Sequence, residues 1–131
     1  MHEVTKSIEF DAAHRLMGYP GLCAELHGHR YRVEVTVRGE ELNELGILVD
    51  FHDLKEWMIF LGDWDHAALL CGNDPLLGQL TRIISFRENP TAEHMAKAIF
   101  NNIRTHLREL PVELVKVRVY ETPDAWADYY E

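Results

Sequence analysis

Apolar and polar residues alternate along several stretches of the chain. The clearest is residues 26–38, where Tyr31, Val33 and Val35 alternate with arginine, glutamate and threonine. Residues 4–10 and 112–120 show the same alternation, and residues 125–130 form a final short aromatic segment. Because successive side chains of a strand point to opposite faces, this period of two predicts four strands, most with one buried face.

Two stretches in the middle of the chain have apolar residues at helical spacing. The first follows Asp50, a suitable N-cap, and is expected to end at Gly62. The second opens at Thr91 and ends before Pro111, which cannot continue a helix. Its apolar positions are Met95, Ala98, Ile99, Ile103 and Leu107.

The order strand, strand, helix, helix, strand, strand predicts an α+β fold. We expect an antiparallel sheet with both helices covering one of its faces. Residues 64–71 have no clear period, and residues 83–86 are expected to form a short extended piece. A length of 131 residues fits a single domain over residues 1–131, with no internal repeat or linker.

The charge and the cysteine content exclude several functional classes. With 13 basic and 22 acidic residues, the formal charge is −9, which argues against a general nucleic-acid-binding protein. The chain has no apolar run long enough for a membrane span and no apolar secretory segment at its start. Its two cysteines do not make a disulfide framework. We therefore expect a cytoplasmic protein with neither nucleic-acid nor membrane partners.

Three histidines are candidate metal ligands. His27 and His29 project to the same face of the strand predicted over residues 26–38, and His14 follows the strand over residues 4–10. The three imidazoles converge if these two strands pair, and three neutral imidazoles with a free fourth position are typical of a catalytic zinc site. The alternative is that they are ordinary core or surface histidines, since the chain has eight in all.

Cys23 lies on a loop rich in glycine and proline, four residues before His27. Near a metal ion, a thiol has a lowered pKa and a larger thiolate fraction, so Cys23 is either a ligand or a reactive group. The alternative is a small buried hydrophobic residue. We assign Cys71, within an alanine and leucine run, to packing.

Two further sets of polar residues are candidates for chemistry. Asp65 and His66 can act as a carboxylate and imidazole pair that activates a third group, or simply as a helix cap and its neighbour. Glu121, at the end of a predicted strand, can accept two N–H bonds from an amide-like heterocycle, or be a solvated strand end.

Six ordered motifs resemble the 6-pyruvoyltetrahydropterin synthase superfamily, and within it the branch that makes 6-carboxytetrahydropterin for queuosine biosynthesis. The resemblance extends from residue 4 to residue 129. The motifs are Phe10-Asp-Ala-Ala-His14-Arg, Cys23-x3-His27-Gly-His29, Val49-Asp50-Phe51-x2-Leu54-Lys55, Asp65-His66, Asn89-Pro-Thr91-Ala-Glu93 and Tyr120-Glu121-Thr-Pro123.

The resemblance implies a tunnelling fold, in which β-β-α-α-β-β subunits join their sheets into a barrel and form a hexamer with active sites between subunits. It also implies the role of each candidate residue. By similarity, His14, His27 and His29 bind Zn²⁺, and Cys23 is the catalytic thiol, completed by Asp65 and His66. Glu121 is the pterin anchor by the same similarity, and Thr91 and Glu93 line the pterin pocket.

The implied reaction converts 7,8-dihydroneopterin triphosphate to 6-carboxy-5,6,7,8-tetrahydropterin, acetaldehyde and triphosphate. The three residues between Cys23 and His27 are fewer than in animal-type pyruvoyl enzymes, which favours the carboxy branch. The alternatives are pyruvoyl synthase activity and a non-catalytic pterin- or metal-binding module. Some relatives replace the cysteine by a nearby glutamate, and Glu25 lies in that neighbourhood. Candidates for holding the triphosphate are Arg15, Arg30, Lys97 and residues of a neighbouring subunit.

Overall fold

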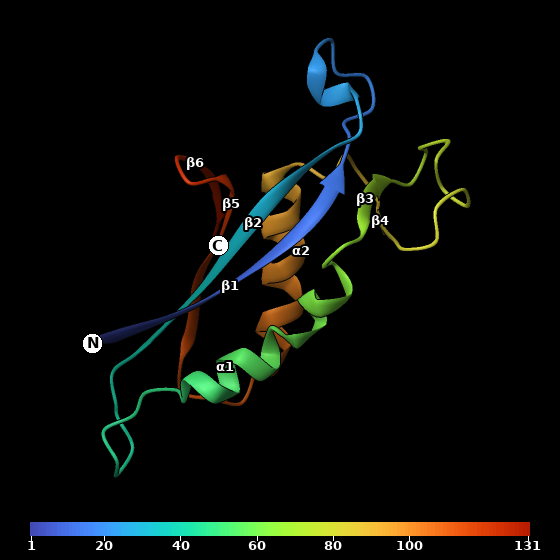
Figure 1. Cartoon of the computed structure of the whole chain (residues 1–131). Coiled ribbons are helices and arrows are strands. Elements are labelled where there is room, and N and C mark those ends of the chain that lie inside the picture. The colour runs from blue at the N-terminus through green and yellow to red at the C-terminus, as the bar shows by residue number, and fades with distance from the viewer.

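The computed structural model describes residues 1–131 and has a six-stranded sheet covered on one face by helices (Figure 1). The order of strands across the sheet is β4-β3-β1-β2-β5-β6. The strands are β1 (His2–His14), β2 (His27–Gly39), β3 (Ala68–Cys71), β4 (Ile83–Phe86), β5 (Glu113–Thr122) and β6 (Ala125–Tyr129). The helices are α1 (Phe51–Trp57) and α2 (Ala92–Ile103), with short 3₁₀ helices η1 (Leu22–Ala24), η2 (Ile59–Asp63) and η3 (Arg104–His106). The predicted α+β fold is confirmed.

The β1–β2 hairpin is the longest paired unit of the sheet. The two strands pair antiparallel without interruption, from His2 opposite Gly39 to His14 opposite His27. The alternation in β2 places Tyr31 and Val33 fully inside the core, whereas the arginines between them face away from it. The pairing therefore continues up to the candidate ligands, which lie at the last rungs of the hairpin.

The sheet is mixed rather than wholly antiparallel, which corrects the sequence-based expectation. Strand β3 pairs parallel to β1, and β4 pairs parallel to β3. All four residues of β3 are buried, so this strand has no alternation of apolar and polar residues. A strand buried on both faces gives a continuous apolar run, which explains why residues 64–71 showed no recognisable period.

The helix after Asp50 is shorter than predicted. Asp50 does cap it, accepting a hydrogen bond from the His52 backbone N–H at 2.8 Å, but α1 ends at Trp57 instead of reaching Gly62. The chain continues as the 3₁₀ helix η2, which is followed by Trp64. The buried residues of this segment are Met58, Leu61 and Trp64, spaced three apart. That spacing matches the three residues per turn of a 3₁₀ helix.

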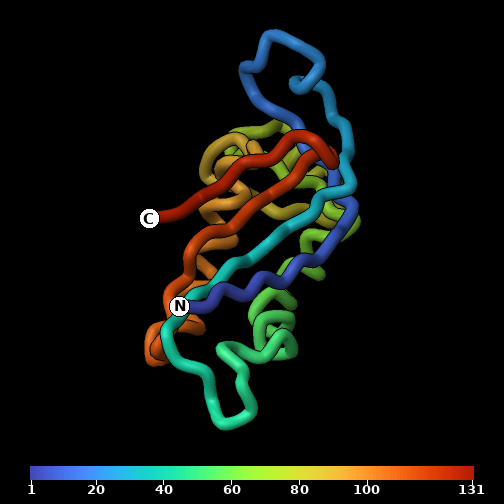
Figure 2. Tube along the Cα trace, turned by 90° about the vertical axis from the view of Figure 1, so that its left-hand side faces the viewer, coloured from blue at the N-terminus to red at the C-terminus, as the bar shows by residue number.

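Helix α2 packs its apolar face against the sheet. Thr91 caps it as predicted, with its hydroxyl accepting a bond from the His94 N–H at 3.2 Å. Met95, Ile99 and Ile103 are fully buried beneath it. Figure 2 shows the helices behind the sheet, with no helix on the other face. No helix of the protein has the length and apolar character needed to cross a membrane.

The connection between β1 and β2, residues 15–26, projects beyond the end of the sheet as an arm that includes η1 (Figures 1 and 2). Its tip is exposed: Leu22 keeps 87% of its surface accessible. Cys23 is only partly buried, and the backbone N–H of Leu16 donates to its carbonyl at 2.9 Å. The arm places Cys23 close to the end of the hairpin.

Candidate active site

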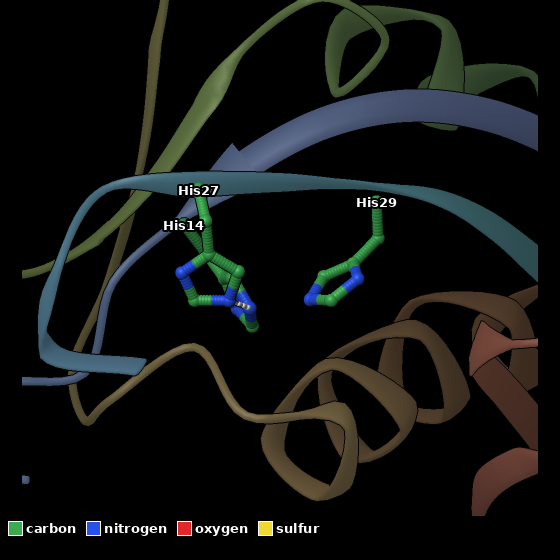
Figure 3. A group of neighbouring side chains, drawn as sticks. All are labelled: His14, His27 and His29. Carbon is green, nitrogen blue, oxygen red and sulfur yellow. Dashed lines mark hydrogen bonds between the residues drawn. The ribbon is translucent and has the colours of Figure 1, made fainter. Parts of the chain in front are cut away.

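The three predicted histidines converge at the end of the β1–β2 hairpin. His14 lies opposite His27 in the strand register, and Ala12 lies opposite His29, so the three imidazoles share one face. One ring nitrogen from each lies within 4.8 Å of those of the other two. Figure 3 shows the rings on one side of β2, facing the loop that leads into α2. The predicted convergence is therefore confirmed.

Backbone carbonyls fix the orientation of two of these rings. His14 Nδ1 lies 2.7 Å from the Pro90 carbonyl oxygen, and His27 Nδ1 lies 2.7 Å from the Glu25 carbonyl oxygen. Because a carbonyl only accepts, both Nδ1 atoms carry a proton, and in the neutral form of each ring Nε2 is left bare. These Nε2 atoms face each other at 3.0 Å.

Two lone pairs at that distance repel each other unless a proton or a cation lies between them. Two nitrogens bound to one zinc ion lie about 3.3 Å apart, given bonds of about 2.0–2.1 Å at a tetrahedral angle. The Nε2 of the third ring, His29, is buried without a hydrogen-bond partner. The donor set therefore fits a metal ion, and three imidazoles suit zinc.

Burial favours the neutral form of two of the three imidazoles, those of His14 and His29. Burial lowers the pKa of His14, which is 1% exposed, and this outweighs the opposing effects of the Pro90 carbonyl and the Glu121 carboxylate. Burial likewise lowers the pKa of His29. A neutral imidazole is the form that binds a metal, so both rings are ready to coordinate near pH 7.

A pocket of about 530 Å³ adjoins the histidines and collects the residues expected to meet the substrate. Cys23 from the arm, Thr91 and Glu93 from the start of α2, and Glu121 from β5 all line it. The Glu121 carboxylate reaches toward the candidate metal ligands, with Oε1 3.9 Å from the Nε2 of His14. Four of the predicted site residues thus share one pocket with an acidic wall.

Tyr31 closes the bottom of the cluster and was not singled out as a site residue from the sequence. Its ring centroid lies 5.4 Å from that of His29 and 5.8 Å from that of His14. The residue is fully buried, and burial together with the charge of Glu121 raises its pKa. The hydroxyl therefore stays protonated, as an uncharged group below the imidazoles.

Asp65 and His66 form a tight turn between η2 and β3. The Asp11 N–H donates to Asp65 Oδ1 at 3.0 Å, and the His66 N–H donates to the Asp11 carbonyl at 2.6 Å. His66 adopts a left-handed backbone with φ of +62°, and its Nδ1 lies 3.1 Å from Asp65 Oδ1. The pKa of Asp65 is lowered mainly by the hydrogen bond from the Asp11 N–H, and further by the neighbouring His66. The pair is therefore an ionised carboxylate beside an exposed imidazole.

This pair lies away from Cys23. His66 lines a different pocket, of about 580 Å³, together with Asp11, Ala13 and Arg30, and His29 also borders it. Along β1 and β2, Asp11, Ala13 and Arg30 alternate with the histidine positions, so their side chains point to the opposite face of the sheet. A single chain thus presents the thiol and the carboxylate–imidazole pair on two separate surfaces.

Two of the three residues considered for the triphosphate, Arg15 and Arg30, already have partners, whereas Lys97 is exposed on α2. Arg15 forms a two-bond ion pair with the buried Asp74, with Nε donating to Oδ2 at 2.7 Å. This pair connects the end of β1 to residues 72–82, a segment without a motif. Arg30 pairs with Asp11 at 3.0 Å. Neither guanidinium is a free cation.

Main-chain groups are the main feature that sequence reasoning missed. Glu25 contributes to the site through its carbonyl, while its side chain is exposed. Pro90 contributes a carbonyl as well, and only its place in the Asn-Pro-Thr motif marked it. Backbone acceptors leave no residue-type signature. Cys71 is buried, with Sγ 3.9 Å from the Arg87 carbonyl, which confirms its assignment to packing.

Comparison with known proteins matches this arrangement to one family. The family model described as 6-pyruvoyl tetrahydropterin synthase matches residues 3–131. A 6-carboxy-5,6,7,8-tetrahydropterin synthase from Rickettsia bellii is 34% identical over 139 residues, which cover 98% of this chain and 99% of that protein. The protein of the same name from Bacillus subtilis is 35% identical, with 97% of this chain and 84% of that protein covered.

Solved structures agree with the sequence comparison. The structure of Caenorhabditis elegans 6-pyruvoyl tetrahydropterin synthase superposes with a TM-score of 0.76 at 27% identity, covering 99% of this chain and 95% of that one. An uncharacterized protein from Wolinella succinogenes superposes with a TM-score of 0.89 at 22% identity, covering 99% and 98%, and shares the fold.

Proposed function

Because the chain belongs to the 6-pyruvoyl tetrahydropterin synthase family, we propose that it is a zinc-dependent lyase acting on 7,8-dihydroneopterin triphosphate. The products are 6-carboxy-5,6,7,8-tetrahydropterin, acetaldehyde and triphosphate, and the pterin product serves queuosine biosynthesis. The observation that carries this proposal is the pocket in which Cys23 and Glu121 meet beside three converging imidazoles. Full-length relatives named for the 6-carboxy product favour that product.

His14, His27 and His29 would hold the zinc ion. When bound, zinc supplies Lewis-acid polarisation of the substrate's side-chain hydroxyl oxygens, which makes neighbouring carbon-bound protons more acidic. Cys23 is on the projecting arm beside this cluster and not within it, since its thiol is absent from the group of converging nitrogen atoms. The thiolate of Cys23 acts as the base that removes such a proton. Because it must remain a free thiol, we assign the reaction to the reducing cytoplasm.

Glu121 anchors the pterin ring. Its carboxylate lines the pocket beside the ligands and can accept two N–H bonds from the aminopyrimidinone edge of the substrate, an arrangement that is strong because the acceptor is ionised. Thr91 and Glu93 line the same pocket at the start of α2 and complete the pterin site. Together these groups place the side chain of the substrate toward Cys23.

Asp65 and His66 relay protons to and from the hydroxyl positions in a site shared between subunits. His66 lines a different pocket from Cys23, so a second copy of the chain supplies the pair to each site. We propose a homo-hexamer, as in the tunnelling fold. Mixing folded Cys23→Ala and His66→Ala proteins under subunit exchange should restore activity in about a quarter of the sites by random assortment. No recovery, despite exchange verified by mass, would contradict a shared site.

Product analysis tests the reaction itself. Zinc-loaded protein is incubated with 7,8-dihydroneopterin triphosphate, and the pterin and aldehyde products are identified by mass spectrometry. Acetaldehyde in equal amount to 6-carboxytetrahydropterin is the expected result. A pyruvoyl pterin without acetaldehyde would identify a 6-pyruvoyltetrahydropterin synthase instead. Tight pterin binding without turnover would indicate a non-catalytic binding module.

A further inference from the structure

The side chain of Asn89 joins the arm of residues 15–26 to the loop in front of α2. Its Oδ1 accepts a hydrogen bond from the Met17 N–H at 2.8 Å, and its Nδ2 donates to the Met17 carbonyl at 2.9 Å. The backbone N–H and C=O of one residue are thereby both satisfied by one carboxamide. The two partners also fix the orientation of the amide, since the N–H requires the oxygen and the carbonyl requires the NH₂ group.

The backbone of Asn89 is held independently of its side chain. Its carbonyl accepts from the Thr91 N–H at 2.8 Å and from His94 Nδ1 at 2.7 Å. The next residue, Pro90, accepts from His14 Nδ1 at 2.7 Å. Asn89 is thus rigidly placed with respect to a metal ligand and to the start of α2, and its side chain extends from this fixed base.

The arm is also attached at its two ends, where Arg15 pairs with Asp74 and the Glu25 carbonyl accepts from His27 Nδ1. Within residues 15–26, the N–H of Leu16 donates to the carbonyl of Cys23 at 2.9 Å, and the remaining backbone bonds are local to η1. The tip is exposed at Tyr19 and Leu22. Met17 is therefore the point at which the arm is fastened to the α2 loop, and its neighbour Leu16 is bonded directly to Cys23.

We infer that Asn89 is a positioning residue that sets the location of the Cys23 thiol relative to the histidine cluster and to the Thr91–Glu93 wall. The two hydrogen bonds between the Asn89 side chain and the Met17 backbone, here called the clamp, fix the base of the arm. The hydrogen bond from the Leu16 N–H to the Cys23 carbonyl then fixes the backbone of Cys23, and so its thiol, relative to that base. A misplacement of about 1 Å can lower a rate on the order of 10²-fold. The inference rests on the proposed role of Cys23 as the base.

Two substitutions separate the parts of the clamp. Asn89→Asp keeps the size and the acceptor for the Met17 N–H but places a second acceptor against the Met17 carbonyl. Asn89→Ala removes both bonds. Asn102→Asp, at an exposed position of α2, is the control for the change of charge.

For both Asn89 variants we expect kcat to fall about 10- to 100-fold, with KM within about threefold of wild type and zinc content unchanged. A second measurement does not depend on turnover. Alkylation of Cys23 by iodoacetamide, followed by mass spectrometry with buried Cys71 as the internal reference, should accelerate several-fold in Asn89→Ala. The Asn102→Asp control should match wild type in all of these measurements.

Each contrary result overturns the inference. Alkylation of Cys23 within twofold of wild type in both Asn89 variants would show that the clamp does not place the thiol. A raised KM with unchanged kcat would assign Asn89 to substrate binding, and loss of zinc would assign it to the metal site. If Asn89→Ala does not fold, Asn89→Asp decides. If wild-type protein does not turn over the pterin triphosphate, the proposed function fails, whereas the alkylation result still tests the clamp.

Discussion

The two faces of the β1–β2 hairpin differ in nearly every physical property. On the helix-covered face, the imidazoles of His14 and His29 are drawn out of water and their pKa values are lowered by burial. On the opposite face, Asp65 remains ionised because the Asp11 N–H bonds to its carboxylate, and His66 is exposed. Adjacent residues of the same strands serve both environments.

The contrast shows how alternation within a strand separates chemical functions. Neutral ligands for a cation need a dry setting, whereas a proton relay needs an ionised carboxylate and access to solvent. Placing both on one face would expose the imidazoles or bury the charge. In the proposed site, each face of the hairpin would have one of these functions, and two copies of the chain would be needed to bring them together.

Removing one histidine from the buried face should have the largest effect on zinc content and turnover. His27→Ala removes one of three ligands, and we expect loss of bound zinc and of all measurable turnover, because two imidazoles hold zinc weakly. Metal content is measured by mass spectrometry after dialysis. Replacement of exposed His52 by alanine should leave both unchanged. Full zinc occupancy in His27→Ala would disprove the three-histidine site.

Removing the thiol should leave the buried face intact but stop the chemistry. For Cys23→Ala we expect full zinc content and a loss of kcat of about 10²–10⁴-fold, the usual contribution of a general base. Cys71→Ala serves as the matched control for thiol removal. If zinc is lost along with activity, Cys23 is a ligand and not the base.

Neutralising the pterin anchor should have a smaller effect that is confined to binding. Glu121→Gln replaces an ionised acceptor by a neutral amide, and we expect KM to rise about tenfold or more, with zinc retained. Glu109→Gln, at an exposed position before β5, is the control. An unchanged KM would show that the pterin ring is held elsewhere.

On the opposite face, Asp65 should make a small, pH-dependent contribution to the free energy of unfolding. The folded-state pKa of Asp65 is lowered from its ordinary 3.8, so its stabilising contribution is complete above that value and is lost as the pH falls through the folded-state pKa. In Asp65→Asn, the free energy of unfolding should therefore depend less steeply on pH between roughly pH 5 and pH 2. Urea titrations across this range measure it. Identical slopes in both proteins would contradict a lowered pKa.

Strong local patterns in the sequence predicted most of the fold. The alternation through Val33 and Val35 identified β2, and the caps at Asp50 and Thr91 placed both helix starts. The parallel strand β3 was not predicted, because all of its side chains are buried and its sequence therefore shows no alternation of apolar and polar residues. The mixed sheet depends on that strand, so its topology could not be read from periodicity.

The candidate site was predicted where side chains carry the chemistry and missed where the backbone does. The pairing of His14 with His27 follows from a strand register that the two long alternating segments suggest. The carbonyls that orient these rings come from Glu25 and Pro90, and any residue type supplies the same carbonyl. The separation of Asp65 from Cys23 depends on the sheet faces, which only the assembled strands define.

The carbonyl contacts of His14 and His27 also determine when the metal can arrive. Both ligands belong to a hairpin that is fully paired along its length, and their rings are oriented by the chain itself. The chain has a large apolar core of its own, so we expect its folding not to require an ion, unlike that of zinc fingers. For the proposed zinc site, this means that metal would bind after folding. A chelator should then remove the ion, and added zinc should restore it, without passage through an unfolded state.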